Sequence, residues 1–447
     1  MVENLFAYVA LGCIGLVLLL LIFRQPYLGV VFTIATLPVI DLFPDIPLFS
    51  SIAVPLGLVT LVSYLFQSKG STKKRQKWLD PIYIFRLLFI FWTVIADPEA
   101  AFFGKDRVWT LTFVQLWILM LLSGELLSTP QRQQTAMLIF AVAAMISASF
   151  AIFQGEIAED AVSSARVAGL ATNANQAARY FVIALVFFYY LRTKTSSPFK
   201  KLIFLIGIFI TFIGVFFTVS RSGILLLFGA FGLILIFQPR VKNKVGAIIL
   251  LVAGLLVVSF FSDSIFRIIR DIFPAIQEGT DTVGLRYNLW RAGWRMWLEN
   301  PLGGVGIGQY NRNLWRYMAD MQGPTRGSAS SHNTYVQVLS ETGLVGLFAF
   351  MGMLVNSFIH LWPSTARAMD KDEDLRNTWF IVLLIISVGG ITITDLANKI
   401  LWMVMGVSVV FGNQKFVEEE KSLSESVKQI YTSDTSIRIR RWMKNIK

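Results

Sequence analysis

One short segment carries side chains suited to acid–base chemistry. It runs from Ser330 to Gly346 and contains His332, one of only two histidines in the chain. An imidazole has a pKa near neutrality and is well suited to act as a general base. Asn333, Gln337 and Glu341 follow at intervals of four residues, so a helix would place them in one polar stripe beneath His332. The pattern predicts a catalytic base at His332, with Gln337 and Glu341 in supporting roles.

The other members of this segment set limits on that prediction. Glu341 lies nine residues beyond His332, about half a turn around a helix, so it cannot simply orient the imidazole. We expect an arginine from a neighbouring helix to be its partner. His360 stands at the opposite end of the same apolar run, and we expect it to be structural.

Arginines gather before that segment. The stretch 263–334 holds eight arginines and no lysine, among them Arg286 and Arg291. Arginine presents a planar, bidentate fork to phosphate and stays protonated when it is partly desolvated. The pattern therefore favours a phosphorylated or diphosphate substrate. Compositional drift and contact with lipid headgroups, above all for Arg286, remain alternatives.

Two further stretches present arginine close to apolar runs. Arg221 lies in the tight turn Val219–Gly223 between two such runs, while Arg166 and Arg179 flank Asn175, a plausible helix N-cap. We expect these three arginines to contribute to substrate binding. Capping and snorkelling would explain each of them separately.

The stretch before His332 contains an aromatic helix and a glycine-rich run. Between Leu285 and Trp297, one helical face collects Tyr287, Trp290, Trp294 and Trp297, as in a helix that lies on a membrane surface. The run Asn300–Tyr310 has four glycines in six residues, which could form an anion-binding concavity but fit a plain turn better. Tyr310, which ends this run, is a candidate substrate contact.

The elements that must position these residues are transmembrane helices. Hydrophobic residues make up 55% of the 447 residues and charged residues only 15%, against roughly 25% in soluble domains. The apolar runs approach the length of about 20 residues that a helix needs to cross a bilayer, and they lack the alternation of barrel strands. We predict an all-α polytopic membrane protein with 12 or 13 spans, at residues 4–23, 27–44, 50–67, 82–97, 108–126, 134–153, 176–191, 202–219, 222–237, 245–262, 335–359, 378–394 and 400–412.

The charges fix the orientation of these spans. Lysine and arginine collect in cytoplasmic loops, so we place the basic loop 69–77, residues 192–201, 240–244 and 367–376, and the C-terminal tail inside. The stretches 155–175 and 263–334 and the turn at Arg221 then lie outside. Nearly all lysines fall inside; Lys105 and Lys399 are the exceptions. The side on which the N-terminus lies stays open, because 4–44 could be one span or two.

This topology predicts five regions. They are N-terminal transmembrane helices (1–154), central helices with the outer-face arginines Arg166, Arg179 and Arg221 (155–262), a long extracytoplasmic loop with amphipathic helices (263–334), C-terminal transmembrane helices (335–412) and a cytoplasmic tail (413–447). The single cysteine, Cys13, excludes a disulfide within the chain and a cysteine metal site. We expect no metal and no other cofactor.

Several of these motifs together resemble the O-antigen ligase and O-antigen polymerase family. The resemblance runs through Ser220-Arg221-Ser-Gly, Arg286 with Trp290, the run Asn300–Gly308, and the block from His332 to Gly343. It covers roughly residues 160–350 in detail. In place of the Pro-Asn that relatives often show before the helix after residue 170, this chain has Ala174-Asn175, which puts a specific role for Asn175 in doubt.

The resemblance implies a metal-independent membrane glycosyltransferase with GT-C-like architecture. Such proteins take a glycan from undecaprenyl diphosphate and transfer it to a sugar hydroxyl of an acceptor glycan or glycolipid, at the periplasmic face of the bacterial inner membrane. His332 would then be the base, and Arg221 and Arg286 would hold the diphosphate. Arg166, Arg179, Arg291, Asn333 and Tyr310 are further candidates for substrate binding.

Two other functions stay open from the sequence. A multi-pass transporter of anions such as bicarbonate would suit a dozen helices, but the polar residues concentrate in one outer loop and no internal repeat is evident. A non-catalytic partner in polysaccharide export is the second alternative. The sequence does not distinguish a ligase from a polymerase, and nothing in it indicates nucleic-acid binding.

Overall fold

The structure is a computed structural model that describes residues 15–43, 52–68, 80–97, 107–157, 168–218, 220–237, 282–318, 330–363 and 373–412. In these ranges the secondary structure is helical, with no strand. The described part of the chain is thus all-α, as the apolar patterning predicts. The labelled helices are α2 (Tyr27–Ala35), η1 (Leu37–Leu42), α3 (Ala53–Ser68), α4 (Pro81–Ala96), α6 (Arg107–Leu126), α7 (Pro130–Ile157), α8 (Ala174–Lys194), α9 (Pro198–Phe217), α10 (Arg221–Phe237), α13 (Thr282–Glu299), α14 (Tyr310–Tyr317), α15 (Thr334–Leu361) and α16 (Glu373–Gly389). Two further apolar helices, Gly15–Arg24 and Lys399–Gly412, complete the set.

Most predicted spans correspond to one helix each. The helix starts also follow local rules: Asp80 caps α4 and Ser197 caps α9, each followed by a proline at the first helical position. The prediction for 27–44 was wrong in form, because the segment divides at Thr36 into α2 and the 3₁₀ helix η1, with Pro38 near its start. Nine residues of α2 extend only about 14 Å, too short to cross a bilayer. The predicted span 245–262 and most of 4–23 lie outside the described residues.

Four of the described helices are long and apolar enough to cross a membrane, namely Val108–Leu126, Pro130–Phe153, Pro198–Phe217 and Thr334–Leu361. Five more apolar helices are shorter; in chain order the first of them is Gly15–Arg24 and the last is Lys399–Gly412. The protein is therefore a multi-pass membrane protein. The total of 12 or 13 spans stays a prediction.

Helix α8 is the centre of one half of the molecule. It packs against α7, α9, α10 and α16, and most of its residues are buried, from Ala174 to Leu191. Glycines allow the close approaches around it: a Cβ at Gly207 of α9 would lie 2.7 Å from the ring of Phe188. Close contacts through small residues are typical of membrane helix packing.

A second group of helices surrounds α15, which packs along α4. Gly406 of the helix Lys399–Gly412 lies against the backbone of α6, where a Cβ would come within 2.2 Å of the Met120 carbonyl oxygen. Arg86 of α4 is fully buried in this group, donates to the Phe113 carbonyl at 2.5 Å and stacks 3.7 Å from the ring centre of Trp402. A buried cation thus joins three helices.

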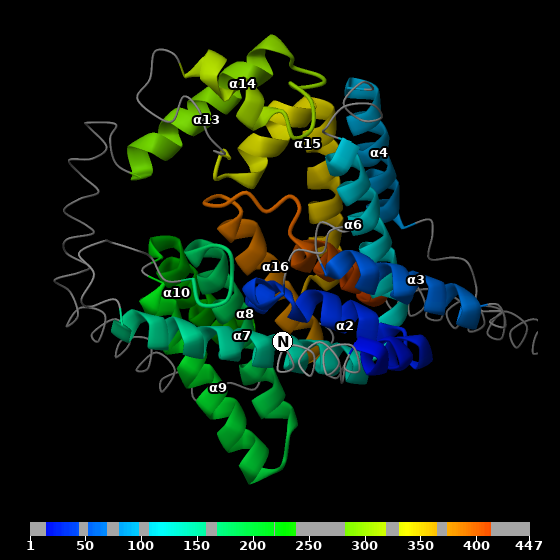
Figure 1. Ribbon diagram of the computed structural model, residues 1–447, viewed down its shortest axis with the longest axis vertical. Helices are drawn as coiled ribbons and strands as arrows, with labels where there is room; N and C mark the ends of the chain where they lie inside the picture. The colour runs from blue at the N-terminus through cyan, green and yellow to red at the C-terminus, as the bar shows by residue number, and fades with distance from the viewer. Residues whose placement is uncertain are drawn as a thin grey trace, which may run out of the picture.

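Helices α13 and α14 form a cap at one end of the molecule. Figure 1 shows them at the top of the view, above the N-terminal end of α15 and remote from α9. Both pack against α15, and a separate small core that includes Leu289, Met296, Tyr310 and Leu314 joins them to each other. The cap places the arginine-rich stretch beside the segment that contains His332.

Candidate active site

His332 is held by fixed neighbours on both sides. Ser331, which is fully buried, donates its backbone N–H to the side chain of Gln337 at 3.1 Å, and its carbonyl accepts from the indole of Trp290 at 3.0 Å. On the other side, Asn333 caps α15, and its side chain accepts from the backbone N–H groups of Tyr335 and Val336. The position of His332 is therefore set by α13 and α15 together.

The backbone of His332 is in an uncommon conformation. Its φ is +49°, and among the described residues it is the only non-glycine with positive φ. The left-handed region costs an L-residue roughly 1–3 kcal/mol and is maintained only where the surroundings enforce it, often at functional sites. The side chain itself is only partly exposed. Here the hydrogen bonds of Ser331 and Asn333 hold the backbone of His332 in this conformation.

Arg286 of α13 lies close enough to His332 to act on its charge. Burial lowers the pKa of His332 below its ordinary value of 6.5, and the positive charge of Arg286 lowers it further. At neutral pH the imidazole is therefore neutral and able to accept a proton. The fold thus brings the predicted base, His332, close to a predicted phosphate contact, Arg286, although the two residues are far apart along the chain.

The polar stripe beneath His332 is buried and internally bonded. Gln337 donates to Oε1 of Glu341 at 2.5 Å, and the same oxygen accepts from the backbone N–H of Tyr310 at 3.1 Å. The exposed fractions of Gln337 and Glu341 are 8% and 3%. The hydroxyl of Tyr310 donates to the Leu289 carbonyl at 2.6 Å. The stripe thus connects the segment before His332 to the start of α14. Glu341 is held by Gln337 and by the backbone amide of Tyr310, and an arginine partner for it stays a prediction.

The glycine-rich run binds to a break in α15. Gly343, with φ +65° and ψ −164°, interrupts the helix and frees neighbouring backbone groups. The Ser340 carbonyl accepts from Val305 N–H at 2.9 Å, the Glu341 carbonyl from Gly306 N–H at 3.1 Å, and Leu344 N–H donates to the Pro301 carbonyl at 2.9 Å.

The indole of Trp92, on α4, satisfies the next carbonyl, that of Thr342, at 2.9 Å. The backbone amides of the glycine-rich run that would line an anion-binding concavity are in part committed to α15. This geometry fits a plain turn. The hydrogen bonds between the turn and the break in α15 also fasten the cap to α15, and we call this set of hydrogen bonds the latch.

Helix α13 confirms the predicted aromatic helix in part. Tyr287 and Trp294 are exposed, as expected for a face in contact with a membrane surface, while Trp290 turns inward to Ser331. Arg291 is exposed. Arg295 instead donates to the Tyr317 carbonyl at 3.1 Å and so fastens α13 to the end of α14.

A buried ion pair lies behind the site. Both terminal nitrogens of Arg179 contact the carboxylate of Asp395, with Nη2 to Oδ1 at 2.7 Å, and each side chain is 1% exposed. The backbone N–H of Asp395 donates to the hydroxyl of Thr334, the first residue of α15, at 2.9 Å. Asn398 adds donors to Asp395 and to the Tyr180 hydroxyl, each at 3.1 Å. The predicted phosphate ligand Arg179 therefore already holds a carboxylate, one that fixes the start of α15.

The start of α10 is fastened to the start of α8. Ser220 donates from its hydroxyl to the side chain of Asn175 at 2.8 Å and accepts from Gly223 N–H at 3.1 Å, so it caps α10. The expectation that Asn175 caps α8 was wrong: Asn173 is the cap and accepts from Asn175 N–H at 2.8 Å. The N-terminal ends of α8, α10 and α15 are thereby linked in one cluster.

Arg221 is the first residue of α10 and stands at this cluster. Its guanidinium is partly exposed, and its buried Nη1 has no hydrogen-bond partner among the described residues. A cation with an unused donor next to helix N-termini is a favourable place for an anion, because the helix dipoles add positive potential there.

An apolar groove begins beside Arg221. It has a volume of about 380 Å³ and lies between α10 and α16, with Ser222 and Thr392 near the end at Arg221. Leu225, Leu384 and Val388 form part of its walls. Gly229, two turns along α10, also lines it, and a Cβ there would meet no other atom within 4 Å. The groove is therefore unobstructed at Gly229, and an apolar chain could lie in it.

The described site residues thus fall into three groups, and Arg166 is left out of them. His332, Arg286, Asn333, Gln337, Glu341 and Tyr310 lie along the contact between the cap and α15, whereas Arg179 and Arg221 lie at the clustered helix ends, Arg291 is exposed on the cap, and Arg166 is outside the described residues. In the described part, no group of three or more potential metal ligands occurs. Sequence reasoning missed Asp395 and Ser331; an acidic residue between two apolar spans was the signal available for Asp395.

Comparison with known families agrees with the motifs. The family model described as O-antigen ligase matches residues 206–351, about a third of the chain, which includes Arg221, Arg286 and His332. No curated protein matches the chain. The matched family is one of membrane glycosyltransferases of polysaccharide biosynthesis, whose substrates are in general a lipid-linked glycan and an acceptor glycan. The resemblance that the sequence motifs indicate is thereby confirmed over residues 206–351, which match the O-antigen ligase family model.

Proposed function

We propose that the protein transfers a glycan from a polyprenyl diphosphate, of the undecaprenyl type, to a sugar hydroxyl, and that His332 is the general base. The acceptor oxygen attacks the anomeric carbon of the donor sugar, and the bond from that carbon to the diphosphate oxygen breaks. The bonding electron pair leaves with the diphosphate, and the proton of the hydroxyl passes to the imidazole. Because its pKa is lowered, His332 is ready to accept that proton at neutral pH.

The departing diphosphate needs cations, and the site offers two. Arg286 stands near His332, and Arg221 has an unused buried donor at the N-terminal ends of α8, α10 and α15. Guanidinium groups at these places would stabilise the charge that develops on the leaving oxygen, as electrostatic catalysis requires. Arg179 takes an indirect role in this proposal: through Asp395 it positions the start of α15.

The apolar groove between α10 and α16 suits the lipid part of the donor. It begins beside Arg221, and from Ser222 to Ile236 it follows about 21 Å of helix. With the diphosphate at Arg221, the polyprenyl chain would extend along the groove over Gly229.

The direction of the site follows from the charge distribution. The positions of the basic loops and the basic tail support, under the positive-inside rule, a location of the stretch 263–334 outside the cytoplasm. We therefore assign the reaction to the periplasmic face of the inner membrane. Arg291, exposed on the cap, and the exposed aromatic face of α13 would there contact the membrane surface and the donor glycan.

The observation that carries this proposal is the geometry of His332, a residue with positive φ, fixed on both sides and adjacent to Arg286, inside the matched domain. The test is transfer by purified protein from a short-chain polyprenyl diphosphate glycan, without an ion gradient. We expect His332→Gln to lower the rate by about 10²- to 10⁴-fold, with donor binding retained. Near-normal turnover of His332→Gln would remove the assignment of the base. Solute uptake with no transfer would favour a transporter.

A further inference from the structure

A second cavity lies away from the site that contains His332. It has a volume of about 220 Å³ and lies among α2, α3, α6 and the start of the helix Lys399–Gly412. None of the residues assigned above to base or diphosphate binding lines it. A typical pocket for a small molecule is about 300–1,000 Å³. The cavity is therefore of a size for a narrow ligand or for one part of a larger one.

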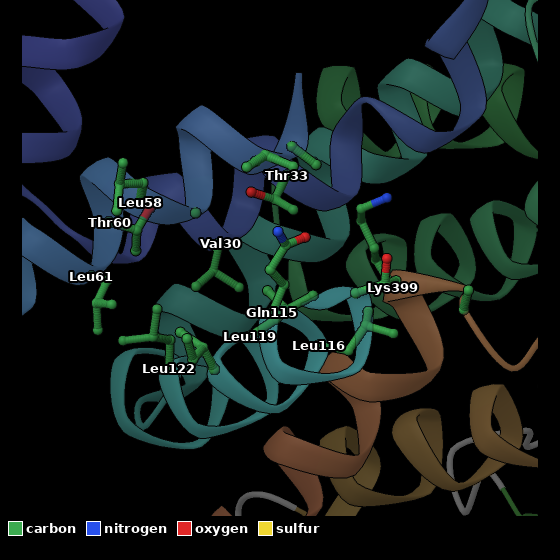
Figure 2. Close-up of a pocket in the computed structure, with 16 residues that line it drawn as sticks. Val30, Thr33, Leu58, Thr60, Leu61, Gln115, Leu116, Leu119, Leu122 and Lys399 are labelled. Atoms are coloured by element: carbon green, nitrogen blue, oxygen red, sulfur yellow. The ribbon is translucent and has the colours of Figure 1, made fainter. Parts of the chain in front are cut away.

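The two ends of the cavity differ in polarity. Figure 2 shows Lys399 at one end, with Gln115 and Thr33 next to it, and Leu61 and Leu122 at the other end. The remaining walls are mostly apolar. A ligand that matches this gradient has a polar head and an apolar chain.

Two polar side chains at the head end have no hydrogen bond or ion pair to other residues in the described ranges. They are the ammonium of Lys399 and the amide of Gln115, which lies eight residues into the apolar span Val108–Leu126. Polar and charged groups within a membrane are costly and normally have a partner. Lys399 is also one of the two lysines that the charge pattern places outside the cytoplasm.

The shared chemistry of these donors selects an anion. An ammonium and an amide N–H₂ both donate, and the oxygens of a phosphate group accept from both. Leu58 at the cavity margin is 55% exposed on the outer surface of α3, so the cavity borders the region where bilayer lipid would lie. A molecule already present in the bilayer can enter from that side.

We propose that this cavity binds an anionic phospholipid of the bilayer, with its phosphate at Lys399 and Gln115 and one acyl chain between α3 and α6. The bound lipid fills the space between α2, α3 and α6 and neutralises the half-buried ammonium of Lys399. This is a lipid site separate from the groove at Arg221, and it does not depend on the proposed transfer reaction.

The first test measures retained lipid by native mass spectrometry, on full-length protein prepared from bilayers that contain phosphatidylglycerol. Wild type should retain phosphatidylglycerol, and Lys399→Met should retain at least about tenfold less, as expected for the loss of a charged hydrogen-bond donor. Lys200→Met, at the exposed start of α9, is the matched control and should retain the lipid. Equal retention in Lys399→Met and wild type would overturn the proposal.

A second variant leaves the charge in place and fills the cavity. A Cβ at Gly57 of α3 meets no other atom within 4 Å, and Gly57 lines the cavity, so the side chain of Gly57→Leu should occupy part of its space. It should also lose the lipid, whereas Gly229→Leu in the α10 groove should keep it. If Gly57→Leu retains the lipid, the chain does not occupy this cavity.

The choice of lipid is tested with defined bilayers. Phosphatidylglycerol should raise the melting temperature of wild type above its value in phosphatidylcholine, and Lys399→Met should lose that difference. An equal melting temperature in both lipids would contradict an anionic occupant. Recovery of a polyprenyl diphosphate with wild type but not with Lys399→Met would assign the cavity to the substrate lipid instead and overturn the proposal.

Discussion

The latch between the glycine-rich run and the break in α15 leads to a sharp prediction at two adjacent glycines. Gly304 has φ +69°, and a Cβ there would lie 2.4 Å from the Glu341 carbonyl carbon and 2.6 Å from the Ser340 carbonyl oxygen. These are backbone atoms that cannot move aside. Gly303 has no positive φ, and a Cβ there would meet only the methyl group of Ala96 at 3.6 Å.

The cost of Gly304→Ala can be summed from these contacts. The left-handed conformation costs an alanine roughly 1–2 kcal/mol. The clash separates the glycine-rich run from α15 and removes the hydrogen bonds that Val305 and Gly306 donate, at about 1 kcal/mol each. The total is about 3–4 kcal/mol for opening the latch, or roughly a 10²- to 10³-fold larger open fraction. Gly303→Ala should be neutral or slightly stabilising, because it restricts only the unfolded chain.

Hydrogen exchange at the amides of Val305 and Gly306 measures this directly in detergent-solubilised protein. In Gly304→Ala these two amides should lose protection by about the factor given above, while amides in the middle of α8 keep theirs. Transfer should fall as well, since Tyr310 N–H leaves Glu341 when the latch opens. Equal protection in the two alanine variants would refute the reasoning.

Two further predictions concern the charge at His332 and the lipid groove. The rate should rise with pH as His332 loses its proton; because burial and Arg286 lower its pKa, the rising limb should lie below the ordinary value of 6.5, and Arg286→Gln should move the limb to higher pH. A limb that does not move in Arg286→Gln, measured at saturating donor, would contradict the coupling. Gly229→Leu should raise the KM for a long-chain donor at least tenfold, yet melt no lower than wild type, because leucine is a better helix former than glycine by about 1 kcal/mol. An unchanged KM, or a similar rise for a donor with a chain too short to reach Gly229, would place the polyprenyl chain elsewhere.

The sequence predicted the helices well because apolar run length is a local property. Ten of the predicted spans correspond to single helices, and the aromatic helix at α13 was found from its spacing. The exception at 27–44 arose because average hydropathy does not register a local break, here near Pro38. The cap of α8 was misplaced by two residues, since Asn173 and Asn175 are chemically identical candidates.

The site was predictable as residue types but not as contacts. His332 and Arg286 were selected by type and position, and their proximity needed the fold. The pairing of Arg179 with Asp395 joins residues 216 positions apart, which one sequence cannot reveal. The break at Gly343 was invisible because a glycine within an apolar run is common in membrane helices.

That long-range pair has a consequence for biosynthesis. When the ribosome has just made α8, Arg179 enters the membrane more than two hundred residues before Asp395 exists. An arginine costs a lone helix up to about 2.5–3.5 kcal/mol at the membrane centre, and less toward the helix ends where Arg179 lies. Helix α8 is also absent from the four described helices that are long and apolar enough to span a membrane. We therefore expect α8 to depend on neighbouring helices or on the insertion machinery until Asp395 has been made. Chains truncated before Asp395 should therefore leave the buried Arg179 without its carboxylate partner, and we expect them to be degraded faster than the full chain.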